Sequence, residues 1–246
     1  MDYSKYVYTK RERIRYGTCG GMAAFVILML FYDNVVVCCF GAIVAAVLFL
    51  KYYRLILIKK RRWELTVQFK DATESLVSAI VAGYSLENAV RQAERDLGLM
   101  YDQEDIIMIE FSQMTHKMDL TVPAAELLKD LGIRSGVEDI RTFSEIIMTA
   151  RKTGGNLVQV MRRTAGNIAE RIEMKREIET LISGKRMEAN CMTAIPLLII
   201  VYLRIFSPGF LDPLYHNLMG VCVMTGALVV FVAAFLWGQK LMDIQL

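Results

Sequence analysis

Residues Leu218–Trp237 have the sequence LMGVCVMTGALVVFVAAFLW, which is twenty residues long and contains no charged side chain. At a rise of about 1.5 Å per residue, an α-helix of this length crosses the ~30 Å hydrocarbon core of a bilayer. The 246-residue chain is 54% hydrophobic and 22% charged, which excludes a disordered protein and suits a single water-soluble globule poorly. The sequence therefore predicts a membrane protein whose charged residues are gathered in separate segments.

Three further apolar segments complete the predicted membrane part. Cys191–Leu203 is one of them, and its apolar sequence continues past Arg204. Residues 16–50 would form one helix of roughly 50 Å, which is too long for a single crossing. Asp33 and Asn34 favour a turn inside this segment because their side chains bond to the nearby backbone. We therefore expect a helical hairpin with arms at Tyr16–Phe31 and Val35–Tyr53.

Two alternatives exist for the N-terminal hairpin. One is a single span followed by a helix buried in a protein core. The other is a cleaved signal peptide in residues 1–31, which also has a basic start and an apolar run. A hairpin or a signal-anchor is favoured because the apolar sequence resumes directly after Asn34.

The distribution of Lys and Arg predicts the orientation of the spans, because cytoplasmic loops carry an excess of these residues. Basic residues precede the first span and follow the second, whereas the turns at Asp33 and at 207–217 contain neither Lys nor Arg. We therefore expect four spans in the cell membrane, with both termini and the middle of the chain in the cytoplasm. The basic residues are Lys5, Lys10, Arg11, Arg13, Arg15, Lys51, Arg54, Lys59, Lys60, Arg61 and Arg62.

Two features of the membrane segments need an explanation. Arg204 is a charge in the last turn of its span, where its side chain can reach the interface as an anchor or pair with Asp212. The spacings Gly17-x-x-x-Gly21 and Gly41-x-x-x-Ala45 permit close approach of helices. We expect these small residues to pack the hairpin on itself or on its neighbours, and a specific dimer motif is the less favoured interpretation.

Between Lys51 and Arg186 the apolar residues recur with the 3.6-residue period of helices, and the alternation typical of strands is absent. Glycines and capping residues divide this region into six predicted helices, which would pack as a bundle. The first helix ends at Gly83. Ser85 caps the second helix, which ends at Gly98.

Further signals set the bounds of the next three helices. The third begins at Asp102, and the fourth covers Pro123–Leu131 with Gly132 after it. Ser135-x-x-Glu138 is a predicted capping box that opens the fifth. The predicted inward-facing residues of the first three helices and the fifth are Leu65, Phe69, Ala72, Leu76, Ile80, Leu86, Val90, Ala93, Leu97, Ile107, Phe111, Met114, Met118, Ile140, Phe143, Ile147 and Ala150.

The sixth helix is predicted to be the longest. It follows Gly154-Gly155, is capped by Asn156, and has its apolar line at Leu157, Met161, Thr164, Ile168, Ile172, Lys175, Ile178 and Ile182. No proline interrupts it before Pro196, so we expect it to run directly into the third span. The chain is thus predicted to be an all-α integral membrane protein with four transmembrane helices and one cytoplasmic six-helix bundle. The expected domains are 1–62, a basic N-terminus and hairpin; 63–186, the bundle; and 187–246, a second hairpin.

The sequence contains no pattern typical of a catalytic, cofactor or metal site. Ser183-Gly184-Lys185-Arg186 lacks the upstream glycine of a phosphate-binding loop. His116 and His216 are predicted on opposite sides of the membrane, and the five cysteines fall in membrane segments without C-x-x-C spacing. Glu104-Asp105 and Glu138-Asp139 suit the first turns of helices, where the dipole favours negative charge. We expect no enzyme activity and no cofactor, and a divalent ion between bundle helices stays open. Lys59–Arg62 is expected to attract anionic lipid headgroups, and nucleic-acid binding is disfavoured.

Two glycine motifs carry a family resemblance. Ala82–Ala89, with the sequence AGYSLENA, is a helix stop, a cap and a restart; the same device returns as Thr153-Gly154-Gly155-Asn156-Leu157 before the long helix. That helix enters a span containing Ala194-Ile195-Pro196. This arrangement resembles the type II secretion system F family over roughly residues 64–237. It is most similar to the tight-adherence (Tad/Flp) pilus branch, which has one cytoplasmic domain between paired spans.

The resemblance implies a non-enzymatic inner-membrane platform protein of type II secretion or type IV pilus assembly. The implied partners are a hexameric secretion ATPase, pilins or pseudopilins, further copies of the chain or a paralogous platform protein, and membrane lipid. A membrane-anchored signalling bundle and a transporter subunit are the alternatives. The family motif residues, which the resemblance implies to be structural, are Gly83, Ser85, Leu86, Ala89, Gly154, Gly155, Asn156, Leu157 and Pro196.

Overall fold

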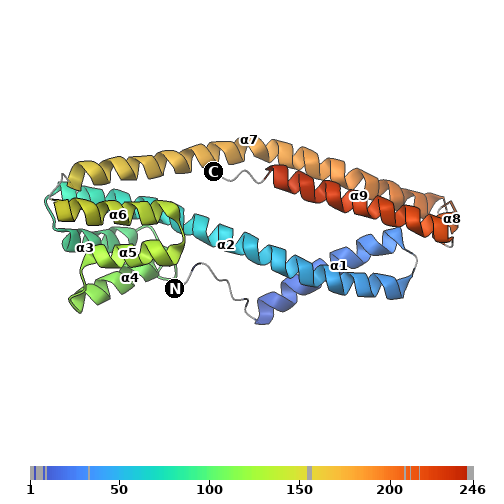
Figure 1. Cartoon of the computed structure of the whole chain (residues 1–246), viewed down its shortest axis with the longest axis horizontal. Helices are drawn as coiled ribbons and strands as arrows, with labels where there is room; N and C mark the ends of the chain where they lie inside the picture. Colours follow the sequence, from blue (N-terminus) through green and yellow to red (C-terminus); the bar gives the residue numbers. More distant parts are fainter. Residues whose placement is uncertain are drawn as a thin grey trace. The chain divides into compact units, whose positions relative to one another are not determined.

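The computed structural model describes residues 3, 8, 10–32, 34–153, 157–207, 209–210, 212–215 and 217–242. This part of the chain is helical and contains no strand, as the sequence predicts (Figure 1). The helices are α1 Lys10–Phe31, α2 Val35–Val81, α3 Leu86–Leu97, α4 Ile106–Asp119, α5 Ala124–Ser135, α6 Glu138–Thr153, α7 Leu157–Phe206, α8 Asp212–Tyr215 and α9 Leu218–Met242.

The chain forms two compact units. The bundle unit consists of Met1–Val7 and Arg54–Met174, and the membrane unit consists of Tyr8–Tyr53 and Lys175–Leu246. Four of the described helices, α1, α2, α7 and α9, are long and apolar enough to cross a membrane. The described helices therefore include four candidate spans, the number that the sequence predicts.

The second predicted membrane arm does not end at Tyr53. Helix α2 is 47 residues long and contains both this arm and the first predicted bundle helix. The reason is local, because no proline lies between Val35 and Val81 and the Lys, Arg and Leu residues that follow Tyr53 are good helix formers. The prediction of a continuous sixth helix is confirmed, since α7 runs for 50 residues with Pro196 inside it.

The small residues of the N-terminal hairpin pack its two arms together. A Cβ atom added to Gly21 would lie 3.5 Å from the Ala46 side chain, and one added to Gly41 would lie 2.7 Å from Leu28 Cδ1. The expected packing of the hairpin on itself is therefore confirmed. Gly20, which the spacing pattern did not single out, is closer still to α2, because a Cβ atom there would lie 2.6 Å from Phe49 Cδ1.

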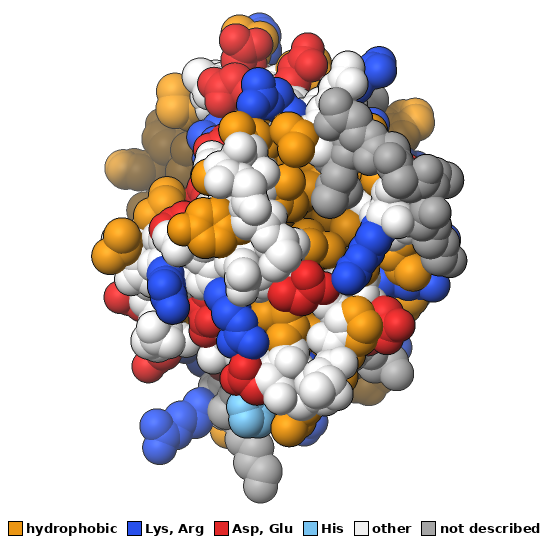
Figure 2. Space-filling model, turned by 90° about the vertical axis from the view of Figure 1, so that its left-hand side faces the viewer, with side chains coloured by type: hydrophobic (Ala, Val, Ile, Leu, Met, Phe, Trp, Pro, Cys, Tyr) orange, Lys and Arg blue, Asp and Glu red, His pale blue; other side chains and the backbone are white. Residues whose placement is uncertain are grey.

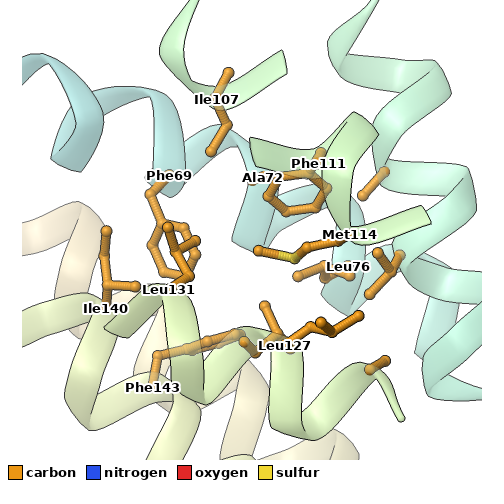
Figure 3. Packing of buried hydrophobic residues seen from close by; sticks show 14 of the residues in the cluster. Phe69, Ala72, Leu76, Ile107, Phe111, Met114, Leu127, Leu131, Ile140 and Phe143 are labelled. Carbon is orange, nitrogen blue, oxygen red and sulfur yellow. The ribbon is translucent and has the colours of Figure 1, made fainter. Parts of the chain in front are cut away.

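The bundle core is built from the apolar faces that the sequence predicts. Figure 3 shows Leu76 of α2 next to Met114 of α4, whereas Phe69 of α2 lies on the side of Leu131 of α5 and Ile140 of α6. The rings of Phe69 and Phe143 meet edge to face with their centroids 5.4 Å apart, a favourable geometry for aromatic pairs. The fully buried large residues of the core include Leu65, Phe69, Leu76, Leu97, Ile107, Phe111, Leu128, Leu131, Ile140, Phe143 and Ile147.

The apolar line of α7 is only partly buried. Met161 and Ile172 are 0% and 2% exposed, whereas Ile178 and Ile182 are half-buried. The change falls where the chain passes from the bundle unit to the membrane unit after Met174. Among the described side chains of the predicted line, those in the bundle unit are therefore buried and those beyond Met174 are not fully buried.

Two predicted helix bounds around α5 are wrong. Gly132 does not end this helix, which continues to Ser135 and is followed by Gly136 in a left-handed conformation with φ of 62°. A Cβ atom at Gly132 would lie 2.9 Å from Arg141 Cα in α6, so this glycine permits the close approach of α5 and α6. The Ser135 hydroxyl accepts a hydrogen bond from the Val137 amide, at 3.2 Å. It therefore bridges the turn between the two helices instead of capping α6 from three residues away.

The start of α4 also differs from the prediction. The helix begins at Ile106 and not at Asp102, because Asp105 accepts a hydrogen bond from the Asp102 amide at 2.9 Å and thereby closes a turn before the helix. Gln68 of α2 accepts from the Ile107 amide at 3.1 Å. A side chain from another helix thus satisfies one of the free amides at this N-terminus.

Candidate functional site

The motif at Ala82–Ala89 forms the turn between α2 and α3. The Gly83 amide donates to the Ile80 carbonyl at 3.0 Å, and the Tyr84 amide donates to the Ala79 carbonyl at 3.1 Å. This pair of bonds is the Schellman motif, which places the glycine in a left-handed conformation, and Gly83 has φ of 93°. A Cβ atom at Gly83 would meet nothing within 4 Å. The position therefore needs glycine for its backbone conformation and not for lack of space.

Ser85 restarts the helix directly after this turn. It is the N-cap of α3, and its hydroxyl accepts a hydrogen bond from the Asn88 amide at 3.3 Å. Leu86 and Ala89 are 5% and 0% exposed and direct the first turn of α3 into the core. These four motif residues thus set the path of the chain between two helices.

The second glycine motif lies largely outside the described residues. This applies to Gly154, Gly155, Asn156 and the side chain of Leu157, whereas the backbone of Leu157 begins α7. Arg151, two residues before Thr153, forms an ion pair with Glu87 in the first turn of α3 at 3.1 Å. The end of α6 is therefore linked to the start of α3, next to the first motif.

Pro196 is exposed and lies in the apolar part of α7. Because proline has no amide hydrogen, the carbonyl of Met192 does not receive the usual helical hydrogen bond. In a membrane segment this freed carbonyl is a place where the helix can bend or accept a bond from a neighbour.

A buried polar cluster was not predicted from the sequence. Glu110 of α4 is 1% exposed and accepts two hydrogen bonds from the Arg134 guanidinium, at 2.8 and 3.1 Å. The Tyr3 hydroxyl donates to the same carboxylate at 2.6 Å, and the Tyr3 amide donates to the Arg134 carbonyl at 3.2 Å. Asp130 accepts a further hydrogen bond from Arg134 Nε at 2.7 Å. Tyr3, itself 2% exposed, is thereby held in the bundle core.

The electrostatics of this cluster favour its charged form. Burial raises the pKa of Glu110, but the hydrogen bonds from Arg134 and Tyr3 outweigh burial and leave the pKa below its ordinary value. Burial and the bond to Glu110 raise the pKa of the Tyr3 phenol, so Tyr3 keeps its proton. One sequence signal could have revealed Glu110, because it lies on the same helix face as Ile107 and Met114, inside the predicted apolar stripe.

The end of the bundle at the α2–α3 turn exposes apolar side chains. Val81 and Tyr84 flank Gly83 and are about half exposed, and Leu120 at the α4–α5 turn is 65% exposed. Figure 2 shows apolar side chains in the middle of this end of the molecule, with Lys, Arg, Asp and Glu side chains around them. Such a surface is suited to contact with a protein partner.

No group of three or more His, Cys, Asp or Glu side chains is close enough to hold a metal ion in the part of the chain that the structure describes. One surface depression of about 260 Å³ mixes Lys60 and Arg61 with Glu64, Glu104 and Asp105. The lining contains both basic and acidic side chains, so the depression is not specific for an anion or a cation.

Comparison with known families decides the assignment. The family model described as type II secretion system (T2SS), protein F, matches residues 68–203. The chain belongs to this family. In this family member the matched range begins in α2 and ends in α7, so it contains the described bundle helices and most of the third span. It does not reach α1 or α9, and it is shorter than the range 64–237 expected from the sequence. No curated protein and no solved structure matches the chain.

Proposed function

We propose that this family member is the non-enzymatic inner-membrane platform of a type II secretion or type IV pilus assembly machine. In this role it couples a cytoplasmic hexameric ATPase to the extraction of pilins or pseudopilins from the bilayer and to their assembly. The family assignment supports a membrane platform. The presence of one bundle between two apolar hairpins supports the tight-adherence (Tad) pilus branch in particular.

The observation that carries the proposal is the continuity of α2 and α7. Each of these helices contains an apolar segment long enough to span a membrane and a segment whose side chains belong to the bundle core. Their 47 and 50 residues correspond to helices of about 70 and 75 Å. Because hydrogen bonds join each turn of a helix to the next, displacement of the bundle segment is carried into the apolar segment.

The proposed topology follows from the distribution of charge. Residues 1–62 form the basic N-terminus and first hairpin, residues 63–186 the cytoplasmic bundle, and residues 187–246 the second hairpin, with both chain ends in the cytoplasm. Reporter fusions at Asn217 and at Leu246 test this topology. The proposal requires Asn217 outside and Leu246 inside, and the same side for both would refute it.

The motif residues have a structural role in this proposal. Gly83, Ser85, Leu86 and Ala89 shape the α2–α3 turn. Gly154, Gly155, Asn156 and Leu157 would do the same at the start of α7, and Pro196 would allow α7 to bend within the membrane. Further copies of the chain, or a paralogous platform protein, would complete the platform.

The direct test is photo-crosslinking in cells. A photoreactive amino acid replaces Tyr84 at the exposed end of the bundle, and the matched control replaces Gln113, which is exposed in the middle of α4. We expect Tyr84 to capture the secretion ATPase more strongly than Gln113. Failure of every bundle position to capture an ATPase, or capture of a membrane sensor or transport subunit instead, would contradict the proposed function. The purified chain itself is expected to hydrolyse no ATP.

A further inference from the structure

The two membrane hairpins turn at the same end of the membrane unit, and polar groups of one close the helix end of the other. Helix α1 ends at Phe31, and the last carbonyls of any helix lack donors within that helix. The Leu28 carbonyl accepts from the Tyr32 amide at 2.8 Å. The next two carbonyls, of Met29 and Leu30, receive their donors from the C-terminal hairpin.

Arg204 and Tyr215 are these donors. Arg204 Nη1 donates to the Met29 carbonyl, and the Tyr215 hydroxyl donates to the Leu30 carbonyl at 2.7 Å. The Arg204 guanidinium also lies 5.8 Å from the centre of the Tyr215 ring, within the range of a cation–π interaction. The two donors are thus in contact with each other as well as with adjacent carbonyls of α1.

A third hydrogen bond joins the same hairpins. The hydroxyls of Tyr32 and Thr225 are 2.8 Å apart. Thr225 donates its single hydroxyl hydrogen to the Val221 carbonyl at 2.7 Å, so Tyr32 is the donor to Thr225. The rings of Phe31 and Phe231 lie beside this bond, with centroids 6.5 Å apart.

Electrostatics explain why an arginine is placed here. The C-terminal end of a helix carries roughly half a negative charge, which a cation stabilises. Carbonyls without donors are costly where water is scarce, and the surrounding helices are apolar. Arg204 supplies both a positive charge at this helix end and a donor for one of its carbonyls. A side chain that only contacted lipid headgroups would supply neither to α1.

We propose that Arg204 and Tyr215 are positioning residues of a joint that holds the two membrane hairpins together as one body. The sequence predicts that Arg204 acts as an interfacial anchor or pairs with Asp212, whose side chain lies outside the described residues. The geometry assigns Arg204 a partner that no sequence pattern shows, namely the end of α1. A displacement that enters the membrane unit through α2 or through α7 would therefore reach both hairpins. This inference concerns the membrane unit alone and does not depend on the identity of the ATPase or the pilin.

The test measures the proximity of the hairpins in the full-length chain in membranes. Cys19, Cys38, Cys39, Cys191 and Cys222 are replaced by alanine, and Tyr32→Cys with Thr225→Cys supplies a pair for a short bis-methanethiosulfonate crosslinker. The pair uses the third contact and leaves the two carbonyl bonds intact. Arg204→Gln and Tyr215→Phe are compared with Arg186→Gln, the same change at an exposed position of the same helix.

We expect Tyr215→Phe to slow crosslinking about fivefold, the effect of losing one net hydrogen bond, and Arg204→Gln to slow it further. Arg186→Gln should crosslink at the parent rate. An anchor that merely contacts lipid predicts equal rates for all variants, and that result would overturn the joint. If Arg204→Gln fails to insert, Tyr215→Phe decides, because it removes one hydroxyl and no charge.

Discussion

Replacement of Arg134 by methionine should destabilise the bundle strongly. Arg134 donates two hydrogen bonds to Glu110, and the Glu110 side chain is only 1% exposed. Methionine keeps much of the apolar stem but removes every guanidinium donor, so a buried carboxylate loses its charged partner. Breaking such a pair costs roughly 3–5 kcal/mol. The Arg134 side chain is 25% exposed, and water screens it in part, so we expect the lower end of that range, about 3 kcal/mol.

A surface ion pair between α3 and α4 of the same bundle supplies the control. Arg91 and Asp119 form an ion pair at 2.7 Å with side chains 39% and 58% exposed. Exposed pairs contribute about 0–1 kcal/mol, so Arg91→Met should lower the free energy of unfolding by no more than that. The comparison separates the effect of burial from the effect of losing an arginine.

Trp63 fluorescence is a suitable assay because this side chain packs partly buried against the bundle core. The full-length chain in mild detergent carries Trp237→Phe, so that Trp63 is the sole reporter, and unfolding is followed in urea. A further variant combines Glu110→Leu with Arg134→Met. Replacement of both charged partners by apolar residues should recover part of the stability lost in Arg134→Met. Equal losses for Arg134→Met and Arg91→Met would refute the reasoning, as would a double variant less stable than Arg134→Met.

Three other predictions follow from single positions. Gly83→Ala should lower the free energy of unfolding by about 1 kcal/mol because of the left-handed φ of 93°. Gly166→Ala, in open space on α7, should instead raise the free energy of unfolding by up to about 1 kcal/mol. The same urea titration measures both, and a stabilising Gly83→Ala would contradict the turn geometry. Gly132→Ala should cost about 1–3 kcal/mol, since the new Cβ would lie 2.9 Å from the Arg141 backbone, and a neutral result would show that α5 and α6 separate freely. Because its folded-state pKa is lowered, Glu110 stabilises the bundle above about pH 4.5, and this contribution is lost as the pH falls from there through the lower folded pKa. Arg134→Met should therefore make the free energy of unfolding depend less on pH in this acid range. An unchanged dependence on pH would exclude Glu110 as its cause.

The faces of the bundle helices were predictable because burial follows a local period. Phe69, Phe111 and Phe143 lie at positions where the 3.6-residue pattern requires an inward side chain, and all three are buried. Glycines were less informative as boundaries. Gly83 and Gly136 both have positive φ and follow helices, whereas Gly132 lies inside α5 and serves the approach of another helix. The sequence alone does not distinguish a glycine that ends a helix from one that permits packing.

The polar contacts escaped prediction for a different reason. Glu110 and Arg134 are 24 residues apart and meet only because α4 and α5 pack together. Arg204 donates to a backbone carbonyl, and a carbonyl is present at every residue, so no residue type marks the partner. The continuity of α2 past Tyr53 does not follow from composition, because the change from apolar to basic residues there resembles a domain boundary although nothing in it stops a helix.

The most direct test of force transmission breaks α7 between its two functional parts. Ser183, Gly184 and Lys185 are exposed in this helix, so their replacement leaves the bundle core unchanged. Gly-Pro-Gly at these positions interrupts the helix, and Ala-Ala-Ala of equal length preserves it. Both chains are expressed in cells that lack the wild-type copy, and membrane insertion and filament or cargo export are measured. We predict that both chains insert and that only the Ala-Ala-Ala chain supports export; equal export by the two would contradict transmission of force through a continuous α7.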